Sequence, residues 1–524
     1  MRQTVKSSIA ILIGSLVTTV AWQMAAAGLE AGHSSRPPHS QIVFGMAWEP
    51  VGFFPIRAID SGSYYAQTLV YEGLVKYSPE MKIVAGLAED YAILDGGLKY
   101  EFRLRKDLRF SDGTPLTLKD VEISYKLATG PDSPFKGDFS DISSFESVGE
   151  DKFVIHLSAP NAALLSRLVE LRILPSRLTT LPDRGRSVLS RKPISSGPFC
   201  LDKWESGLEL AFSRNPYYWG EKPRVDRLIW RVVPDKTLLA LCLARGEIDV
   251  AQIDAQSWKA ISGNSQLLLD HFAGSRTLYL GLNLSKAPFR SLAFREILCR
   301  AINRQAIVDH LFDGLARVPA TDVPSGSWVF DDQLAACPYD RETARKQLVE
   351  LERTTDNKDI SFRILAVRDH QDMAEAVACD LKKIGIKNEV QLVEFSTLRR
   401  QYLQPGKFDV VIWSRSSGPD PECGIVWSSH GPLNFCRFKN ARVDELITEG
   451  RRAMKPEERA AIYKKIQAIL AHELAWIFLC QPDLLLAHSK DCHNIALGNQ
   501  SNTGLPWDNP LFNASRWERQ AGRP

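Results

Sequence analysis

The stretch that decides the fold runs Phe102-Arg-Leu-Arg-Lys-Asp-Leu-Arg-Phe-Ser-Asp112-Gly113-Thr114-Pro115-Leu-Thr-Leu-Lys-Asp120-Val121. Residues 99–105 alternate polar and apolar side chains, which is the period of a half-buried strand. A turn is expected at Asp112-Gly113, because glycine accepts positive φ, and Pro115 fixes the chain that enters the next element. Thr117 then predicts a helix N-cap, with Asp120 at the third helical position. The sequence therefore predicts a strand, a tight turn and a helix over residues 117–128.

Short strands and amphipathic helices alternate along the rest of the chain. Strands are predicted over residues 41–47, 153–157, 208–213, 389–392 and 409–413. Helices are predicted over residues 294–312, 374–384 and 455–474, the last opened by Pro456 in its first turn. Elements in this mixed order are typical of α/β packing with some parallel strand pairs.

The composition is that of a globular chain long enough for about two to four domains of roughly 150 residues. Among 524 residues, 65 Lys and Arg stand against 62 Asp and Glu, and 44% of all residues are hydrophobic. The formal net charge of +3 falls to +1 without Arg2 and Lys6, which belong to the leader described next. So balanced a charge, without a basic run, offers little attraction to a phosphate backbone, and we expect no nucleic-acid partner.

The first 27 residues have the form of a secretory signal peptide. Arg2 and Lys6 precede an apolar stretch from Ile9 to Trp22, and Ala25-Ala26-Ala27 follows. The apolar stretch is shorter than the roughly 20 residues of a membrane span, which argues against an anchor. No Cys follows the small residues, so the lipid-attachment signal is missing. We expect cleavage after Ala27 and a free periplasmic protein.

Nine cysteines follow the signal peptide, and none of them forms a CxxC motif. An oxidising compartment permits disulfides, but an odd number of cysteines cannot all pair. Five lie in apolar runs, where small core residues are expected: Cys200, Cys242, Cys299, Cys379 and Cys480. Cys423 and Cys436 flank a loop with Gly, Ser and His, and whether they form a disulfide stays open.

Motifs of catalysis are missing from the sequence. There is no G-x-S-x-G nucleophile turn and no phosphate-binding G-x-x-x-x-G-K loop. His472-Glu473 begins like a zinc-protease motif, but Trp476 stands where the second His is required. We therefore expect neither an enzyme nor a resident metal or cofactor.

A series of ordered phrases extends the stretch quoted first. They are Tyr71-Glu72-Gly73-Leu74-Val75, Ala85-Gly86-Leu87-Ala88-Glu89, Ser196-Gly197-Pro198-Phe199, Asn215-Pro216-Tyr217-Tyr218-Trp219-Gly220, Gly246-Glu247-Ile248-Asp249-Val250, Leu280-Gly281-Leu282-Asn283 and Lys382-Lys383-Ile384-Gly385-Ile386-Lys387. The whole series resembles the extracytoplasmic solute-binding proteins, family 5, of ABC importers. Members of that family bind dipeptides, oligopeptides, nickel complexes and some sugars. Each phrase alone is weak evidence, but together they cover nearly all of the chain after the signal peptide.

The resemblance implies a bilobed periplasmic-binding-protein fold of type II, in its large three-domain branch, with ligand between the lobes. Lobe I would consist of residues 38–65, 193–273 and 486–524. Domain II would span residues 66–192, and lobe II residues 274–485. The two crossings near residues 273 and 485 would form the hinge. Closure around ligand would then signal occupancy to the permease.

Ligand contacts carry over only where the family's motifs match. In peptide-binding relatives, a strand ends in Gly-Trp, and an Asp three residues after the Trp pairs with the α-ammonium of the peptide. The matching strand here ends at Trp413, either a pocket wall or a strand-end core aromatic, and Ser416 stands at the Asp position. A hydroxyl lacks the charge of that contact, so Asp420, just beyond, would have to substitute for it. The departure argues against ordinary peptide binding.

Further candidate contacts follow from the same resemblance. Arg368 follows a strand where some dipeptide binders hold the ligand carboxylate with an Arg, although a solvated loop Arg is the alternative. Arg415 is another cation near the predicted cleft. Tyr64 and Tyr65 lie where relatives line the lobe I side of the pocket, and they would offer aromatic walls with hydroxyl tips.

The predicted function is that of the binding component of an ABC importer. A monomer would capture a peptide or peptide-like solute outside the cytoplasmic membrane and deliver it to the inner-membrane permease. The alternatives are a non-peptide solute, such as a nickel chelate, an opine or a sugar, and an extracytoplasmic sensor or enzyme that reuses the fold.

Overall fold

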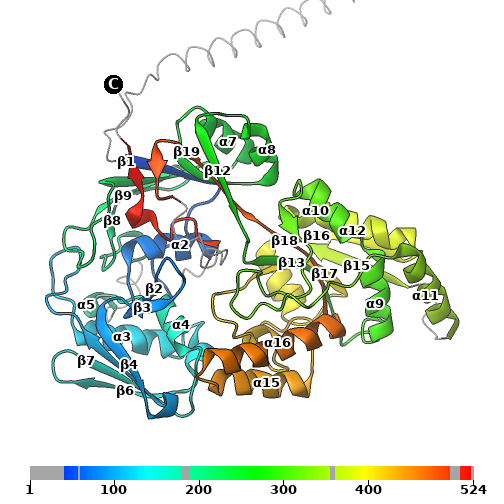
Figure 1. Cartoon of the computed structure of the whole chain (residues 1–524), viewed down its shortest axis with the longest axis horizontal. Coiled ribbons are helices and arrows are strands. Elements are labelled where there is room, and N and C mark those ends of the chain that lie inside the picture. The colour runs from blue at the N-terminus through cyan, green and yellow to red at the C-terminus, as the bar shows by residue number, and fades with distance from the viewer. Residues whose placement is uncertain (1–40, 57–59, 180–188, 355–359, 496–507, 521–524) are drawn as a thin grey trace, which may run out of the picture.

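The computed structural model describes residues 41–56, 60–179, 189–354, 360–495 and 508–520. The predicted signal peptide, residues 1–27, lies outside this part of the chain. Three main sheets organise the described residues, a seven-stranded and a six-stranded mixed sheet and a four-stranded antiparallel sheet (Figure 1). None of the helices in these ranges is both long and apolar enough to cross a bilayer.

The seven-stranded sheet gathers strands from distant parts of the chain. In sheet order they are β12 (Leu267–Phe272), β19 (Leu484–Ser489), β11 (Val250–Ile253), β1 (Gln41–Met46), β10 (Arg227–Val232), β9 (Glu209–Arg214) and β8 (Phe199–Glu205). β1 is parallel to both β10 and β11, so the expected parallel pairs are confirmed. Helices α2 (Ser61–Val70), α7 (Lys236–Ala244) and α8 (Ala255–Ile261) pack with this sheet, and α2 crosses the predicted boundary at residues 65 and 66. All three sequence segments of predicted lobe I contribute to this unit.

The four-stranded sheet contains the stretch quoted first. Its strands, in sheet order, are β4 (Ala88–Leu94), β5 (Lys99–Leu104), β7 (Lys152–Leu157) and β6 (Ile142–Val148), accompanied by the hairpin of β2 (Val75–Tyr77) and β3 (Ile83–Ala85) and by helices α3 (Leu118–Thr129), α4 (Leu164–Glu170) and α5 (Ser176–Thr179). The predicted strand, turn and helix are confirmed. Gly113 has φ +81°, and the Asp120 carboxylate accepts a hydrogen bond from the Thr117 N–H at 2.8 Å, which caps α3.

The six-stranded sheet forms the core of the other lobe. Its strands, in sheet order, are β14 (Ala316–Arg317), β18 (Trp476–Pro482), β13 (Arg276–Leu282), β17 (Val410–Ser416), β15 (Ser361–Ala366) and β16 (Lys387–Leu392). The helices are α9 (Leu292–Ala301), α10 (Arg304–Leu311), α11 (Arg341–Thr354), α12 (Gln371–Lys383), α13 (Phe395–Thr397), α14 (Gly424–Trp427), α15 (Ala441–Arg452) and α16 (Pro456–Glu473). β15 is parallel to both β16 and β17.

One predicted helix is divided in the structure. The apolar spacing predicts a single helix over residues 294–312, but α9 ends at Ala301 and α10 begins at Arg304. Ile302 is extended, with ψ 118°, and the Asn303 side chain accepts a hydrogen bond from the Ala306 N–H at 3.1 Å. The second helix therefore has an N-cap of its own, which the apolar periodicity does not reveal.

Two short connections join the large sheets (Figure 1). One runs from β12 to β13 through residues 273–275, and the other runs from β18 to β19 through residue 483. The positions agree with those expected for the hinge, and the hinge itself and the domain boundaries stay predictions. Tyr218 and Trp219 also join distant segments, because both donate hydrogen bonds to the buried Glu72 carboxylate, at 2.7 and 2.5 Å.

All nine cysteines are free thiols in the structure. Cys423 and Cys436 are both buried and unbridged. Cys299 and Cys480 are buried, as expected, and Cys200 and Cys242 are half-buried. Cys379 is exposed on α12, so its assignment to the core was wrong. An apolar run on an amphipathic helix includes positions that face solvent, and position 379 is one of them.

Candidate functional site

Three predicted site residues lie together at the end of β17. This strand is antiparallel to β13, and the register pairs Trp413 with Tyr279 and Ser416 with Arg276. Side chains alternate between the two faces of a strand. Trp413 and Arg415 therefore share one face, and Ser416 lies on the other beside Arg276. A ligand that touches all three must lie across the end of the strand.

The Trp413 face carries an aromatic pair, in which Trp413 is half-buried and Phe395 is exposed. The rings of Trp413 and Phe395 are stacked, with centroids 5.2 Å apart and an angle of 16° between the planes. Phe395 is 55% exposed at the start of α13, where Glu394 accepts hydrogen bonds from the N–H groups of Ser396 and Thr397. Sequence reasoning missed Phe395. Its only signal is an isolated aromatic residue in a polar segment just after a strand.

Arg415 lies on the same face but has an acidic partner. It forms an ion pair with Asp322, whose side chain is 4% exposed and also accepts a hydrogen bond from the Trp427 indole at 3.1 Å. Arg415 and Asp322 line a cavity of about 440 Å³ that is partly open to solvent. The predicted cation is therefore at a cavity wall, with its charge compensated by a buried carboxylate.

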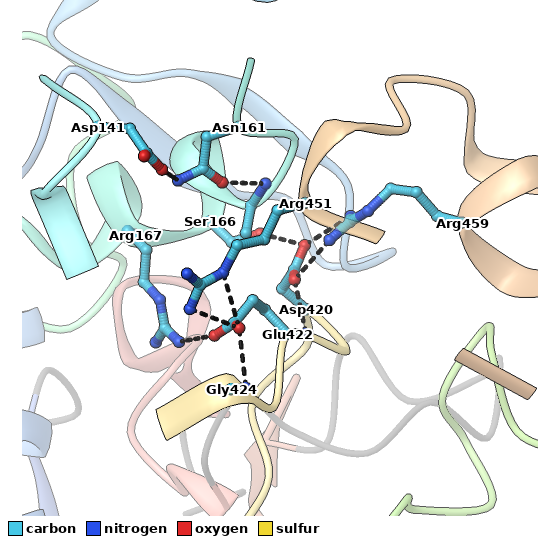
Figure 2. A network of polar contacts seen from close by, with 10 residues as sticks. Asp141, Asn161, Ser166, Arg167, Asp420, Glu422, Gly424, Arg451 and Arg459 are labelled. Carbon is cyan, nitrogen blue, oxygen red and sulfur yellow. Dashed lines mark hydrogen bonds and ion pairs between the residues drawn. The ribbon is translucent and has the colours of Figure 1, made fainter. Parts of the chain in front are cut away.

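Asp420 lines the same cavity and is also paired (Figure 2). Both of its oxygens accept hydrogen bonds from the Arg459 guanidinium at 2.9 Å, and Ser166 approaches it at 3.4 Å. Arg459 is 5% exposed, so this bidentate pair is largely shielded from water. The carboxylate that would substitute for the missing Asp is thus held by an arginine of its own lobe.

The loop that contains Asp420 also contacts domain II through Glu422 (Figure 2). The Glu422 carboxylate accepts from Arg451 at 2.9 Å and approaches Arg167 of α4 at 3.4 Å. The backbone N–H of Ala162 donates to the Arg451 carbonyl at 2.7 Å. We call these contacts the Asp420 network. Its members are Ala162, Ser166, Arg167, Asp420, Glu422, Arg451 and Arg459. It joins the chain just after β17 to the unit built on the four-stranded sheet.

The Ser416 face is polar and cationic. Arg276, its cross-strand neighbour, is exposed. Burial and, to a smaller extent, the charge of Arg276 lower the pKa of His370 to about 4, so the imidazole is neutral at neutral pH. Arg368 is exposed at the start of the same short turn, and its side chain has no hydrogen bond or ion pair with a described residue. At the position where the family resemblance predicts an acid, this chain thus has the Ser416 hydroxyl, with the Arg276 cation across the strand pair.

Lobe I meets this face through α2 and the C-terminal segment. Tyr65 is 5% exposed and lies near Asp508 and Arg276, and burial raises its pKa, so the hydroxyl stays protonated. Asp508 accepts a hydrogen bond from the Ser275 N–H at 2.7 Å. Burial raises the pKa of Asp508, against the Ser275 bond and the Arg276 charge, which lower it. Sequence reasoning missed Arg276, His370 and Asp508, which no local motif marks.

Tyr64, the neighbour of Tyr65, lies beside a different arginine, Arg172. Its ring lies 5.7 Å from the Arg172 guanidinium, and burial raises the pKa of its hydroxyl. Arg172, 9% exposed, lines a second cavity of about 490 Å³ with Arg167, Glu170 and apolar residues of α3. Arg172 was also missed, although an arginine inside the apolar run Leu171-Arg172-Ile173-Leu174 is a visible signal. The two predicted tyrosines thus contact each other edge to face, with ring centroids 6.2 Å apart, while Tyr64 lies beside Arg172 and Tyr65 near Asp508 and Arg276.

A resident metal would need a cluster of ligands. Within the ranges that the structure describes, no group of three or more His, Cys, Asp or Glu side chains is placed to hold an ion.

Comparison with known proteins gives this geometry a context. The model of the family "Bacterial extracellular solute-binding proteins, family 5 Middle" matches residues 82–434. The oligopeptide-binding protein AppA of Bacillus subtilis is 27% identical over 84% of this chain and 86% of its own length. Its structure with a nonapeptide has 24% identity, covers 92% of this chain and 99% of that one, and superposes with a TM-score of 0.80. NikZ from Campylobacter jejuni, solved with Ni(L-His), is 24% identical to this chain. The match covers 92% of this chain and 100% of NikZ, and the two superpose with a TM-score of 0.79. The bilobed periplasmic-binding fold is thereby confirmed.

Proposed function

The chain belongs to family 5 of the bacterial extracellular solute-binding proteins, and from this premise we propose that it captures a peptide or peptide-like solute for an ABC importer. The observation that supports this most is the place where the lobes meet. Trp413 and Ser416 end a strand of one lobe, and Arg276 beside Ser416 lies next to Tyr65 and Asp508 of the other. A solute held there contacts both lobes, which is what closure around a ligand requires.

The two ends of such a solute meet different chemistry. Arg368 is available for a carboxylate, and Trp413 with Phe395 offers a stacking surface for a side chain or a planar group. Ser416 accepts or donates a hydrogen bond to the amine end without a charge. Peptide capture therefore relies on the carboxylate and on aromatic packing more than on the ammonium.

A second class of solute is supported by a separate observation. Arg276 lies directly across from Ser416, and it brings a cation, with the Asp508 carboxylate nearby, to the end of the site where a peptide ammonium would enter. That arrangement suits an anionic conjugate of the opine type, in which the free ammonium is replaced by a carboxylate-bearing group. A nickel chelate, treated as cargo, is a third possibility supported only by the NikZ likeness.

The proposal extends to the fate of the solute and to the state and location of the protein. The solute is released to an inner-membrane permease without covalent change, and the protein acts as a monomer that is neither enzyme nor cofactor-dependent. In this proposal the protein is exported to the periplasm through a signal peptide cleaved after Ala27 and carries no lipid anchor.

Native mass spectrometry of the protein purified from its source tests the proposal. The expected result is a bound mass that denaturation releases as a short peptide or a peptide derivative. An Arg368→Gln variant should retain less of this solute, whereas Arg442→Gln on the exposed face of α15 should retain it fully. A released sugar or metal complex would contradict the peptide assignment. Equal retention of the solute by both variants would contradict the role of Arg368.

A further inference from the structure

Two cysteines of lobe II lie side by side although no motif joins them. Cys299 is on α9 and is 1% exposed, and Cys337 is in the segment that leads to α11. The side chains of Cys299 and Cys337 are close enough for each to shift the pKa of the other, and the Cys337 thiol lies 3.8 Å from the carbonyl oxygen of Pro338. Cys337 packs against the same apolar cluster that contains Cys299. Of the nine cysteines, all within the described ranges, these are the two whose thiols perturb one another.

The backbone around the pair is held in register. The N–H of Asp340 donates to the carbonyl of Arg300 at 2.9 Å, and the Arg304 guanidinium donates to the carbonyl of Cys337. Both contacts join the Cys337 segment to the end of α9 and the start of α10. Hydrogen bonds therefore hold the backbones that carry the two cysteines next to each other, and a disulfide requires such neighbouring backbones.

The charges around the pair favour reaction at Cys337. The neighbouring thiol of Cys299 lowers the pKa of Cys337, and the guanidinium groups of Arg304 and Arg300 lower it further against the effect of burial. The Nε atoms of these two arginines have no hydrogen-bond partner among the described residues. Cys299 is the buried member, and its pKa is raised. A thiolate is the attacking species in disulfide exchange, so Cys337 is the nucleophile of the pair.

We propose that Cys299 and Cys337 form a disulfide in the exported protein, which fastens residues 318–340 to α9. The oxidant is a protein disulfide of the extracytoplasmic space. The Cys337 thiolate attacks one sulfur of that disulfide and releases one donor thiolate. Cys299 then loses its proton and attacks the Cys337 sulfur, which releases the second donor thiolate. Two thiols lose two electrons and two protons, and the donor becomes a dithiol.

The bridge has a structural consequence near the site. Residues 318–340, between β14 and α11, contain no helix or strand. They include Asp322, the partner of Arg415 at the wall of the 440 Å³ cavity. A covalent tie at Cys337 restricts this segment in the unfolded and the folded chain. The proposal rests on export to an oxidising compartment, and it is independent of which solute is bound.

Peptide mapping of the native protein tests the bridge. The protein is purified without reductant, its free thiols are alkylated under denaturing conditions, and the unreduced digest is analysed by mass spectrometry. The expected result is a linked peptide pair containing Cys299 and Cys337, with alkylation at the other seven cysteines. Alkylation of both Cys299 and Cys337, or a link from either one to another cysteine, overturns the proposal.

Thermal melting supplies a second, separate readout. Reductant should lower the Tm of the natural protein by roughly 5 °C. Cys337→Ala should melt lower from the start and should not respond to reductant. Cys379→Ala, which changes an exposed cysteine of the same lobe, should respond like the natural protein. A natural protein without a reductant response overturns the proposed stabilisation, and mapping decides the bridge even where a variant fails to fold.

Discussion

Gly274 approaches the backbone of Pro482 so closely that a Cβ at position 274 would lie 2.0 Å from the Pro482 carbonyl oxygen. Gly274 belongs to the connection from β12 to β13, and Pro482 ends β18 just before the connection to β19. The two crossings between the lobes therefore touch at the predicted hinge. The second is held further by the Asp483 N–H, which donates to the Leu315 carbonyl at 3.0 Å. A movement of one crossing must displace the other.

Gly274→Ala should strongly destabilise the protein. The new methyl group meets backbone and cannot be relieved by a side-chain rotation, so we expect a loss of about 2–3 kcal/mol in the free energy of unfolding. Denaturant unfolding measures it. Gly263→Ala is the matched control, because a Cβ there meets no heavy atom within 4 Å. Equal stability of the two variants would show that the crossings separate readily.

Asp420→Asn should strongly lower the free energy of unfolding and should change the affinity for solute little. The substitution leaves the Arg459 guanidinium buried without its counter-charge, which typically costs about 3–5 kcal/mol. Glu445→Gln is the control, because its ion pair with Arg442 is exposed and contributes at most about 1 kcal/mol. Thermal melting should show a much lower Tm for the Asp420→Asn variant than for the Glu445→Gln variant. Loss of solute binding at an unchanged Tm would instead identify Asp420 as a ligand contact.

The sequence predicted best those elements that are determined by residues close to one another in the chain. The turn at Gly113 and the cap formed by Thr117 and Asp120 depend on neighbours within a few residues. The break after α9 was missed, because apolar spacing continues across Ile302 while the cap at Asn303 depends on one side chain. Periodicity reports burial, and it does not report where a helix is interrupted.

The candidate site was predicted in outline and not in its pairings. The family phrases locate the end of β17, and Trp413 and Ser416 lie there. Arg415 pairs with Asp322, 93 positions away, and Asp420 pairs with Arg459, 39 positions away. No spacing rule encodes contacts between such distant residues, so a cation and an anion expected to face ligand are instead paired with protein groups. Arg276 became visible only through the register of β13 and β17.

Phe395→Ala should weaken solute binding with little effect on stability. Phe395 is 55% exposed, and its ring stacks on Trp413, so the substitution removes contact surface rather than core. Loss of one aromatic contact corresponds to about 3–10-fold weaker binding of the solute that the purified protein releases, measured by calorimetry. Leu208→Ala, equally exposed at 55% in lobe I between β8 and β9, should bind normally. Unchanged affinity in the Phe395 variant would exclude this surface from the site.

His370 should make the protein less stable as the pH falls from about 6.5 to about 4. Burial, aided by Arg276, lowers the pKa of His370 to about 4 in the folded chain, whereas the unfolded chain has an ordinary value of about 6.5. Between these values the unfolded state binds more protons, so stability is fully present above about pH 6.5 and is lost toward pH 4, by up to roughly 3 kcal/mol. His370→Gln should flatten the change in urea midpoint over this window, and His310→Gln, on the exposed face of α10, should keep it. A His370→Gln profile that coincides with the natural one would mean that the imidazole reaches solvent and accepts its proton in the folded state.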